Sequence, residues 1–262
     1  MNQLLQGQVA LITAASKGLG FATALRLAEE GARVAICSRD ESRIQEAVQK
    51  IQEKTGQTPL GLQVDVSNKE DVEKMVRKTI DYFGRIDMLM LNAGGPPAGN
   101  FMDLKDEDWE KAFATNVMSV VRIIKEVVPS MRKQGGGRVV AIASSSVREP
   151  IPGLVLSNVM RTGVAGLMKT LSMELGPDGI LLNTLCPGRI ATDRLDELDQ
   201  GAAAKLEVSM EEVRDEITKG IPLGRYGKPE EFAEAALFLL SPRNSYITGT
   251  VLMVDGGKVN AL

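Results

Sequence analysis

The chain has 262 residues, of which 44% are hydrophobic and 25% charged, and its formal net charge is −3. These values are typical of a globular protein, and the lack of a basic surplus argues against nucleic-acid binding. Histidine is absent and the two cysteines form no CxxC pair, so the sequence offers no zinc site.

No apolar run approaches the roughly 18 residues of a membrane span, and the first residues do not resemble a signal peptide. Cys37 and Cys186 both follow apolar runs, which favours buried thiols, and few cysteines are typical of a reducing compartment. We therefore expect a soluble cytoplasmic protein without nucleic-acid, membrane or metal partners.

Seven short apolar runs alternate with longer helical patterns. Continuous apolar strands are what a sheet buried on both faces requires. The pattern predicts a Rossmann-type, doubly wound α/β fold: a seven-stranded parallel sheet with helices on both faces, in one domain over residues 1–262. The expected strands are Val9–Ile12, Val34–Cys37, Leu60–Val64, Met88–Leu91, Val139–Ala143, Leu181–Leu185 and Val251–Val254.

Helix signals lie between these runs. Asp40 is a good N-cap residue, Gly31 and Gly84 are typical helix stops, and Pro129 is expected to bend or break the helix that contains it. The expected helices are Phe21–Glu30, Glu41–Lys54, Glu70–Phe83, Glu107–Lys133, Val159–Leu175 and Glu230–Leu240.

Residues Arg189–Gly220 interrupt the last β–α unit. The segment is rich in Asp and Glu, has few strong apolar residues and follows the carboxyl end of a strand, where long insertions often form lids. We predict a substrate lid over about 189–220, and a solvated helical excursion remains the alternative.

The junction Thr13–Gly20 follows the first strand and opens a helix. Glycines such as Gly18 and Gly20 let the backbone approach a pyrophosphate, and the helix N-terminus supplies N–H groups and a positive dipole end. A glycine pair at a helix start is by itself also typical of a simple turn. Later strand ends converge on the same crevice; they carry Asp65-Val66, Asn92-Ala93-Gly94, Ser144 and Pro187–Thr192.

Together these residues make the chain resemble the short-chain dehydrogenase/reductase family over essentially its whole length, and most of all the bacterial 3-oxoacyl-acyl carrier protein reductases. Asn116 and the runs Gly224–Glu231, Tyr246–Gly249 and Val254–Gly257 belong to the same similarity. The resemblance implies a bound nicotinamide dinucleotide, a small-molecule substrate and a homotetramer. Its interfaces would be formed by helices 107–133 and 159–175 and by the C-terminal helix and strand.

The resemblance also assigns the site. Catalytic roles are expected for Asn116, Ser144, Ser157 and Arg161. Cofactor contacts are expected from Thr13, Ser16, Lys17, Gly18, Leu19, Gly20, Ser38, Arg39, Asp65, Val66, Asn92, Ala93, Gly94, Arg161, Pro187, Gly188, Ile190 and Thr192.

Two positions depart from the family pattern. Ala14 stands where the family has its first loop glycine, and its methyl group crowds a tight turn. Counting from Ser144, the family's Tyr-x-x-x-Lys pair falls on Ser157 and Arg161. Reduction of a carbonyl needs a proton on oxygen, yet a serine hydroxyl is a weak acid and an arginine cannot relay a proton. Losing a positioned general acid costs about 10²–10⁴-fold.

The replacement donor stays open between the Glu149 carboxylate and a water held by Ser144, Ser157 and Asn116. Glu149 could equally be a solvated loop carboxylate, and Ser157 a remnant without a catalytic part. Arg161 is expected to hold the nicotinamide ribose, as the family's lysine does, and to stabilise an oxyanion.

The residues at the end of the second strand bear on the choice between NAD and NADP. An acidic residue there usually holds the ribose of NAD, but this chain has Ser38-Arg39, with Lys17 in the adjacent loop. A hydroxyl and two cations suit the 2′-phosphate of NADP, so NADP is favoured over NAD. The alternative is that both cations are merely solvated.

Three functional hypotheses follow. The favoured one is an NADPH-dependent reductase of a 3-oxoacyl thioester or related ketone with an altered proton donor. The alternative is a catalytically deficient dinucleotide-binding protein, acting as a sensor or partner subunit. A different reaction on the same scaffold ranks third. Haloalcohol dehalogenases resemble this family and, like this chain, carry arginine at the lysine position, but they retain the tyrosine and lose the cofactor loop, whereas this chain does the reverse.

Overall fold

A computed structural model describes residues 4–261 of the chain. Its centre is one parallel sheet in the order β3-β2-β1-β4-β5-β6-β7. The order reverses between β1 and β4, and this switch point opens a crevice at the carboxyl ends of the strands. The strands are β1 Val9–Ile12, β2 Arg33–Ser38, β3 Leu60–Gln63, β4 Met88–Leu91, β5 Gly137–Ile142, β6 Ile180–Pro187 and β7 Val251–Val254.

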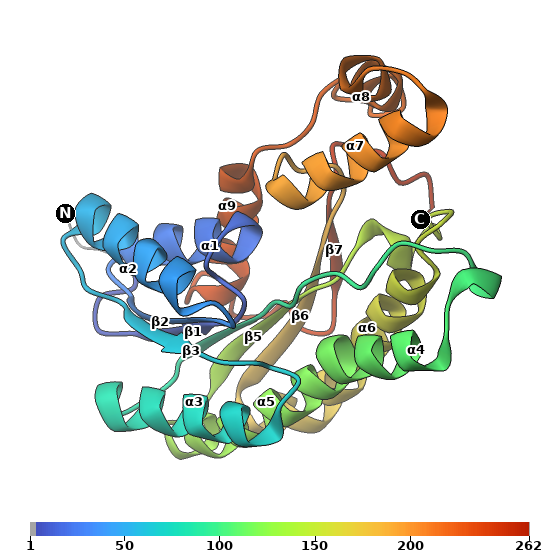
Figure 1. Cartoon of the computed structure of the whole chain (residues 1–262). Coiled ribbons are helices and arrows are strands. Elements are labelled where there is room, and N and C mark those ends of the chain that lie inside the picture. The colour runs from blue at the N-terminus through green and yellow to red at the C-terminus, as the bar shows by residue number, and fades with distance from the viewer. Residues whose placement is uncertain (1–3, 262) are drawn as a thin grey trace.

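The predicted fold is confirmed, and all seven expected apolar runs are strands. Helices cover both faces of the sheet (Figure 1). One face carries α1 Gly18–Glu29, α2 Glu41–Thr55 and α9 Pro229–Leu240, which share a buried apolar cluster with β1 and β2. The other carries α3 Lys69–Phe83, α5 Ser119–Lys133 and α6 Val155–Leu175.

The expected helix Glu107–Lys133 proves to be three segments without a break. α4 Asp106–Phe113 passes into a single π-helical stretch, Ala114–Met118, which continues as α5. Pro129 lies inside α5, and the helix runs on to Lys133, so a break at Pro129 was wrong. Pro129 lies on the exposed side of the helix. The backbone groups that lack its N–H or are crowded by its ring therefore face solvent, and the helix tolerates the proline.

The segment predicted as a lid folds into α7 Asp193–Leu206 and α8 Met210–Lys219. Ser209 caps α8 by accepting a hydrogen bond from the Glu212 N–H, while the Glu212 carboxylate accepts from the Ser209 N–H. The two helices stand away from the sheet, above its carboxyl edge (Figure 1). The segment is thus helical, and its position fits a cover over the crevice.

Both cysteines are buried and free, as expected. Burial raises the pKa of the Cys37 thiol to about 12 and that of Cys186 to about 11, so neither is a reactive thiolate at neutral pH. No helix within residues 4–261 is long and apolar enough to cross a membrane. Within the same residues, no cluster of three or more His, Cys, Asp or Glu side chains is placed to hold a metal ion.

Candidate active site

The loop after β1 is fastened to the end of β4 at the switch point. The Thr13 hydroxyl donates to the Asn92 carbonyl at 2.7 Å and accepts from the Asn92 N–H at 2.8 Å. The Asn92 side-chain amide donates to the Ala14 carbonyl at 3.0 Å. These bonds fix the loop over the crevice and leave no room beside Gly20, where an added Cβ would lie 2.8 Å from the Ala14 oxygen.

Helix α1 begins without a side-chain cap. Its N-cap residue is Lys17, whose side chain makes no capping hydrogen bond, whereas Asp40 caps α2 and Asn68 caps α3. The first N–H groups of a helix have no partner within the helix. At α1 these groups, near Gly18, Leu19 and Gly20, are therefore available to an anion.

Ala14 adopts a left-handed backbone conformation, with φ +47°. The family's glycine at this position would adopt it without strain, whereas alanine pays about 1–2 kcal/mol. The loop nevertheless keeps its hydrogen bonds to Asn92. The methyl group thus strains the turn without disrupting it.

The end of β2 carries the residues expected to choose the cofactor. Ser38 is the last strand residue, and Arg39 is exposed just beyond it. Asp40 accepts hydrogen bonds from the Arg43 N–H and the Ser42 hydroxyl, which hold its pKa below the usual range. Since Asp40 is occupied in capping α2, the exposed charge nearest the strand end is the Arg39 guanidinium.

Lys17 is a half-exposed cation that has a carboxylate partner. Its ammonium forms an ion pair with the Asp193 carboxylate at 2.9 Å, and this pair joins the loop after β1 to the first turn of α7. The hydrogen bond from Lys17 lowers the pKa of Asp193. Sequence analysis identified Lys17 but not this partner, which lies 176 residues away.

Asp65 and Val66 follow β3 at the neighbouring strand end. Val66 is buried, and the Asp65 carboxylate accepts from both the N–H and the hydroxyl of Ser67. Burial alone would raise the pKa of Asp65, but these hydrogen bonds and the charge of Arg39 lower it overall. Asp65 is thus an ionised group close to the end of β2.

Asn116 lies in the π-helical turn, a feature often found at functional sites. It is almost fully buried; its amide nitrogen donates to the Ala112 carbonyl, and its Oδ1 has no hydrogen-bond partner among the described residues. A buried acceptor without a donor is costly. Asn116 therefore presents an open acceptor for a water or ligand.

Arg161 is buried deep in the crevice. Its Nη1 donates to the Ile142 carbonyl at the end of β5, and its Nη2 donates to the Ala93 carbonyl just after β4, both at 3.1 Å. Burial lowers its pKa to about 10, so the guanidinium remains charged at neutral pH. Two of its five N–H groups thus bridge two strand ends, a role that sequence analysis did not foresee.

Ser144 lies two residues beyond β5 and accepts a hydrogen bond from the Ser146 N–H at 3.1 Å. A main-chain hydrogen bond from Ser144 and the charge of Arg161 both act on the Cys186 thiol, which places these three residues together. Ser157 lies half-buried in the first turn of α6, one helical turn before Arg161. Ser157 and Arg161, the two positions where the family has its Tyr and Lys, therefore lie one turn apart on the same helix.

Glu149 and Tyr226 are both engaged elsewhere. The Glu149 carboxylate, which is partly exposed, accepts hydrogen bonds from the main-chain N–H groups of Asn260 and Ala261, so it is a contact for the C-terminal segment. The Tyr226 hydroxyl donates to Asp199. Burial and the Asp199 carboxylate raise the pKa of Tyr226 to about 12, which makes it a poor acid.

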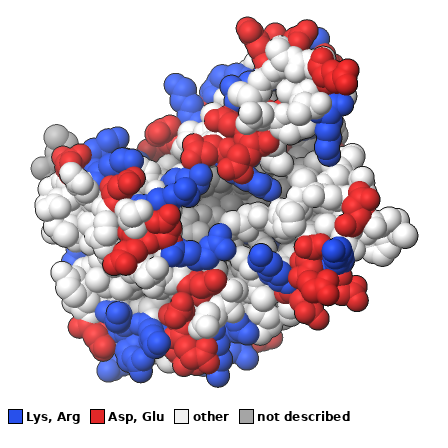
Figure 2. Space-filling view, in the orientation of Figure 1, with Lys and Arg blue, Asp and Glu red and all other residues white. Residues whose placement is uncertain are grey.

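Charged contacts hold α7 and α8, the helices of the segment predicted as a lid. Asp199 of α7 is fully shielded from solvent and binds Arg189 after β6, Arg214 of α8 and Tyr226 before α9. Arg194 of α7 donates to the Pro96 carbonyl in the loop after β4, at 3.1 Å. Figure 2 shows a hollow beneath α7 and α8, with both basic and acidic side chains at its rim.

The residues after β6 lead from the crevice to α7. The Gly188 N–H donates to the Val254 carbonyl, and an added Cβ at Gly188 would lie 2.5 Å from Asp255. Ile190 is buried and pairs with Gly227, and Thr192 lies against Gly18. Pro187, Gly188, Ile190 and Thr192 thus border the crevice opposite the first loop.

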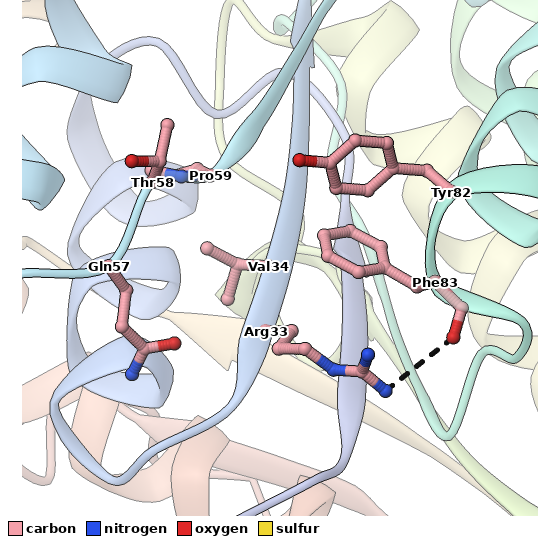
Figure 3. A pocket seen from close by; sticks show the side chains of 7 residues that line it. All are labelled: Arg33, Val34, Gln57, Thr58, Pro59, Tyr82 and Phe83. Carbon is pink, nitrogen blue, oxygen red and sulfur yellow. Dashed lines mark hydrogen bonds between the residues drawn. The ribbon is translucent and has the colours of Figure 1, made fainter.

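A separate hollow of about 460 Å³ lies on the opposite edge of the sheet, between the start of β2 and the end of α3 (Figure 3). Two of its polar side chains are engaged by main-chain carbonyls, although Arg33 Nε has no hydrogen-bond partner among the described residues. Arg33 stacks on Phe83 and donates to the Phe83 and Gly7 carbonyls, and Gln57 donates to Ala28. We therefore place the candidate site at the carboxyl edge.

Comparisons with known proteins identify the family of the chain. Residues 13–258 match a family described as enoyl-(acyl carrier protein) reductase. The chain is 38% identical over 261 residues to dehydrogenase/reductase SDR family member 4 of Homo sapiens, covering 98% of this chain and 90% of that one. It is 37% identical over 257 residues to the 3-oxoacyl-[acyl-carrier-protein] reductase FabG of Chlamydia muridarum, covering 98% and 99%.

The structure is also similar to L-sorbose reductase from Gluconobacter frateurii, solved in complex with NADPH and L-sorbose. The TM-score is 0.95 at 32% identity, and the match covers 100% of both chains. The chain therefore belongs to the short-chain dehydrogenase/reductase family and is an oxidoreductase of that family.

Proposed function

We propose that the protein reduces a carbonyl group, in a 3-oxoacyl thioester or a related ketone, with NADPH and without a tyrosine acid. The observation that carries this proposal is the uncapped start of α1 above the switch point, with Gly20 packed too closely for any side chain. This arrangement suits a pyrophosphate. NADPH, which the L-sorbose reductase structure contains, would supply the hydride.

The residues of the first loop, Thr13 to Gly20, would hold the pyrophosphate. Asp65, Val66 and Asn92–Gly94 would border the adenosine and the adjoining ribose, and Pro187, Gly188, Ile190 and Thr192 the nicotinamide. Arg161 would place its permanent charge beside the nicotinamide ribose. These assignments rest on the ends of β1, β3, β4 and β6, which the residues follow and which meet at one crevice.

Specificity for the 2′-phosphate would come from Lys17 and Arg39, together with the Ser38 hydroxyl. The double variant Lys17→Met/Arg39→Met should bind NADPH about tenfold or more weakly, because each charge-assisted hydrogen bond contributes about 1.5–3 kcal/mol before solvent screening. NADH affinity should not change. Fluorescence titration of both coenzymes checks this, with the exposed α2 residue in Lys50→Met as the control. Equal losses of affinity for NADPH and for NADH would contradict the assignment of Lys17 and Arg39 to the 2′-phosphate.

The proton would reach the substrate oxygen from a water held by Ser144, Ser157 and Asn116. The open Oδ1 acceptor of Asn116 supports this choice, and the Glu149 carboxylate, bound by the C-terminal segment, supports it further. Arg161 would stabilise the developing oxyanion as a fixed cation. A water is a weaker acid than tyrosine, so turnover should be slower than with a positioned acid.

The alternative is a dinucleotide-binding protein without activity, because Arg161 is already bonded to two carbonyls. Coenzyme oxidation with a panel of β-keto thioesters and small ketones separates the two. Under our proposal the wild-type protein turns over at least one compound, and Ser157→Tyr/Arg161→Lys accelerates that same reaction. Coenzyme binding without turnover, joined to new activity in the double variant, would instead show a disabled enzyme.

We also propose a cytoplasmic homotetramer. Large apolar side chains are exposed on both expected interfaces: Phe113, Val159 and Met173 on α4 and α6, and Phe238 and Leu252 on α9 and β7. These five side chains are exposed on the elements that the expected interfaces would cover, which supports the assembly. Light scattering that gives the mass of one chain would contradict this assembly.

A further inference from the structure

Residues 145–154 form a loop, the serine loop, between Ser144 after β5 and the start of α6, where Ser157 lies. It begins as a short 3₁₀ turn in which the Val147 N–H donates to the Ser144 carbonyl at 3.1 Å. The Glu149 N–H then donates to the Ser145 carbonyl at 3.2 Å. A displacement of Glu149 would therefore reach Ser144 across a single turn.

The far end of the serine loop is fastened to α6 beside Ser157. The Asn158 side chain accepts a hydrogen bond from the Ile151 N–H at 3.2 Å and donates to the Ile151 carbonyl at 3.0 Å. Asn158 follows Ser157 directly, and Ile151 follows Glu149 by two residues. Glu149 thus lies between the points where the loop is joined to the two serines.

The Glu149 side chain fastens the middle of this loop to a distant part of the chain. Its Oε1 accepts hydrogen bonds from the main-chain N–H groups of Asn260 and Ala261, at 2.7 and 3.2 Å. Glu149 is partly exposed, and Asn260 and Ala261 are exposed. Ordering mobile groups costs conformational entropy, so the contact steadies the loop only if the segment that supplies the two donors is itself held in place.

The segment after β7 provides such a support. The Asp255 carboxylate accepts hydrogen bonds from the N–H groups of Gly257 and Val259, at 3.0 and 2.9 Å. Asp255 also packs so closely on Gly188 that an added Cβ there would lie 2.5 Å from the Asp255 Cβ. The turn that leads to Asn260 is therefore fixed on the body of the protein.

The same segment also contacts the chain that leaves α8. The Gly256 carbonyl accepts a hydrogen bond from the Leu223 N–H at 3.3 Å. An added Cβ at Gly256 would lie 2.9 Å from Ile221, and one at Gly257 would lie 3.2 Å from Pro222. Residues 221–223 follow shortly after the end of α8 at Lys219. The segment after β7 thus lies between the exit of α8 and the serine loop.

We propose that Glu149 is a positioning residue, which ties the serine loop to the segment after β7 and so keeps the Ser144 and Ser157 hydroxyls in place for proton delivery. The inference rests on the proposed function for the reaction. It makes Glu149 a hydrogen-bond acceptor rather than the proton donor. Through residues 221–223 the connection extends to α8, so a movement of α8 would reach the two serines.

Two pairs of variants separate this contact from the carboxyl group itself. Glu149→Ala removes the acceptor, whereas Glu149→Gln keeps a side-chain oxygen that can accept the same N–H groups. Asn260→Pro removes the N–H of the shorter bond, because proline has none, whereas Asn260→Ala keeps it. We expect kcat to fall about fivefold or more in Glu149→Ala and Asn260→Pro, and no more than about twofold in Glu149→Gln and Asn260→Ala. The Kd for NADPH should not change in any of them.

Hydrogen exchange of the free protein, followed by mass spectrometry, locates the effect. Exchange over residues 145–151 should quicken in Glu149→Ala and in Asn260→Pro, while β1 and β4 keep their protection. Glu46→Ala, the same change at an exposed position on α2, is the control and should alter neither exchange in the serine loop nor kcat. Thermal unfolding checks that each variant is folded.

A proton donor at position 149 would give a different pattern. Glu149→Gln would then lose as much activity as Glu149→Ala, and Asn260→Pro would remain active; this pattern overturns the inference. Unchanged exchange of the serine loop in Glu149→Ala overturns it as well. If the wild-type protein turns over none of the ketones, the proposed function fails, and the exchange measurements still decide whether Glu149 holds the loop.

Discussion

Gly20→Ala should weaken binding of both NADPH and NADH about tenfold to a hundredfold. The added Cβ would lie 2.8 Å from the Ala14 oxygen, 2.8 Å from the Asn92 amide nitrogen and 3.0 Å from the Ala15 Cα. Two of these atoms are main-chain atoms that cannot swing aside, and overpacking of this kind costs about 1–3 kcal/mol. Because the loop must move, the N–H groups at the start of α1 would no longer point at the pyrophosphate.

Coenzyme affinity is measured by fluorescence titration, and folding is checked by thermal unfolding. The matched control is Gly201→Ala, at an exposed position inside α7, where nothing lies within 4 Å of an added Cβ. That change should leave the affinity unaltered and slightly stabilise the helix, since alanine is favoured over glycine in a helix interior by about 0.5–1 kcal/mol. Unchanged coenzyme affinity in Gly20→Ala would refute the phosphate loop.

Asp199→Ala should release the lid. Asp199 is fully shielded and is the common partner of Arg189, Arg214 and Tyr226. Removing one member of a buried charge network costs about 3–5 kcal/mol, and the partial exposure of both arginines places this change near the lower value. We expect faster hydrogen exchange in α7 and α8 and a large loss of kcat/KM, with coenzyme affinity reduced less.

Hydrogen exchange followed by mass spectrometry locates the effect. Protection in β1, β4 and β5 should be retained, because none of the three partners of Asp199 lies in the sheet. Asp215→Ala, at an exposed position on α8, is the control and should leave exchange in the lid close to that of the wild type. An Asp199→Ala protein with normal protection of α7 would show that the lid is held by its apolar contacts instead.

The sheet was predictable because its strands are continuous apolar runs. All four residues of β1 and of β4 are buried, and such runs have few other stable structures open to them. Strand ends were less certain: β6 extends to Pro187, which still pairs with Val254 although it has no N–H to donate. The π-helical turn at Asn116 was not predicted, since neither a proline nor a glycine marks it and its form depends on packing against α6.

The candidate site was predictable where it follows strand ends and unpredictable where it depends on distant pairs. Thr13 and Asn92 were both identified, but their mutual hydrogen bonds join residues 79 positions apart. The role of Asp199 was missed for a related reason, because an acidic residue in an acid-rich helix is usually a solvated one. Only the fold brings two arginines and a tyrosine to it.

The ion pair between Lys17 and Asp193 links entry of the coenzyme to the position of the lid. Any 2′-phosphate that binds Lys17 competes with the carboxylate that fastens the first turn of α7 to the body of the protein. Both side chains are largely exposed, so dissolved salt weakens their attraction. A higher ionic strength therefore weakens both the Lys17–Asp193 ion pair and the attraction of Lys17 for the 2′-phosphate of the incoming dinucleotide. The apparent affinity for the dinucleotide reports the difference between these two effects.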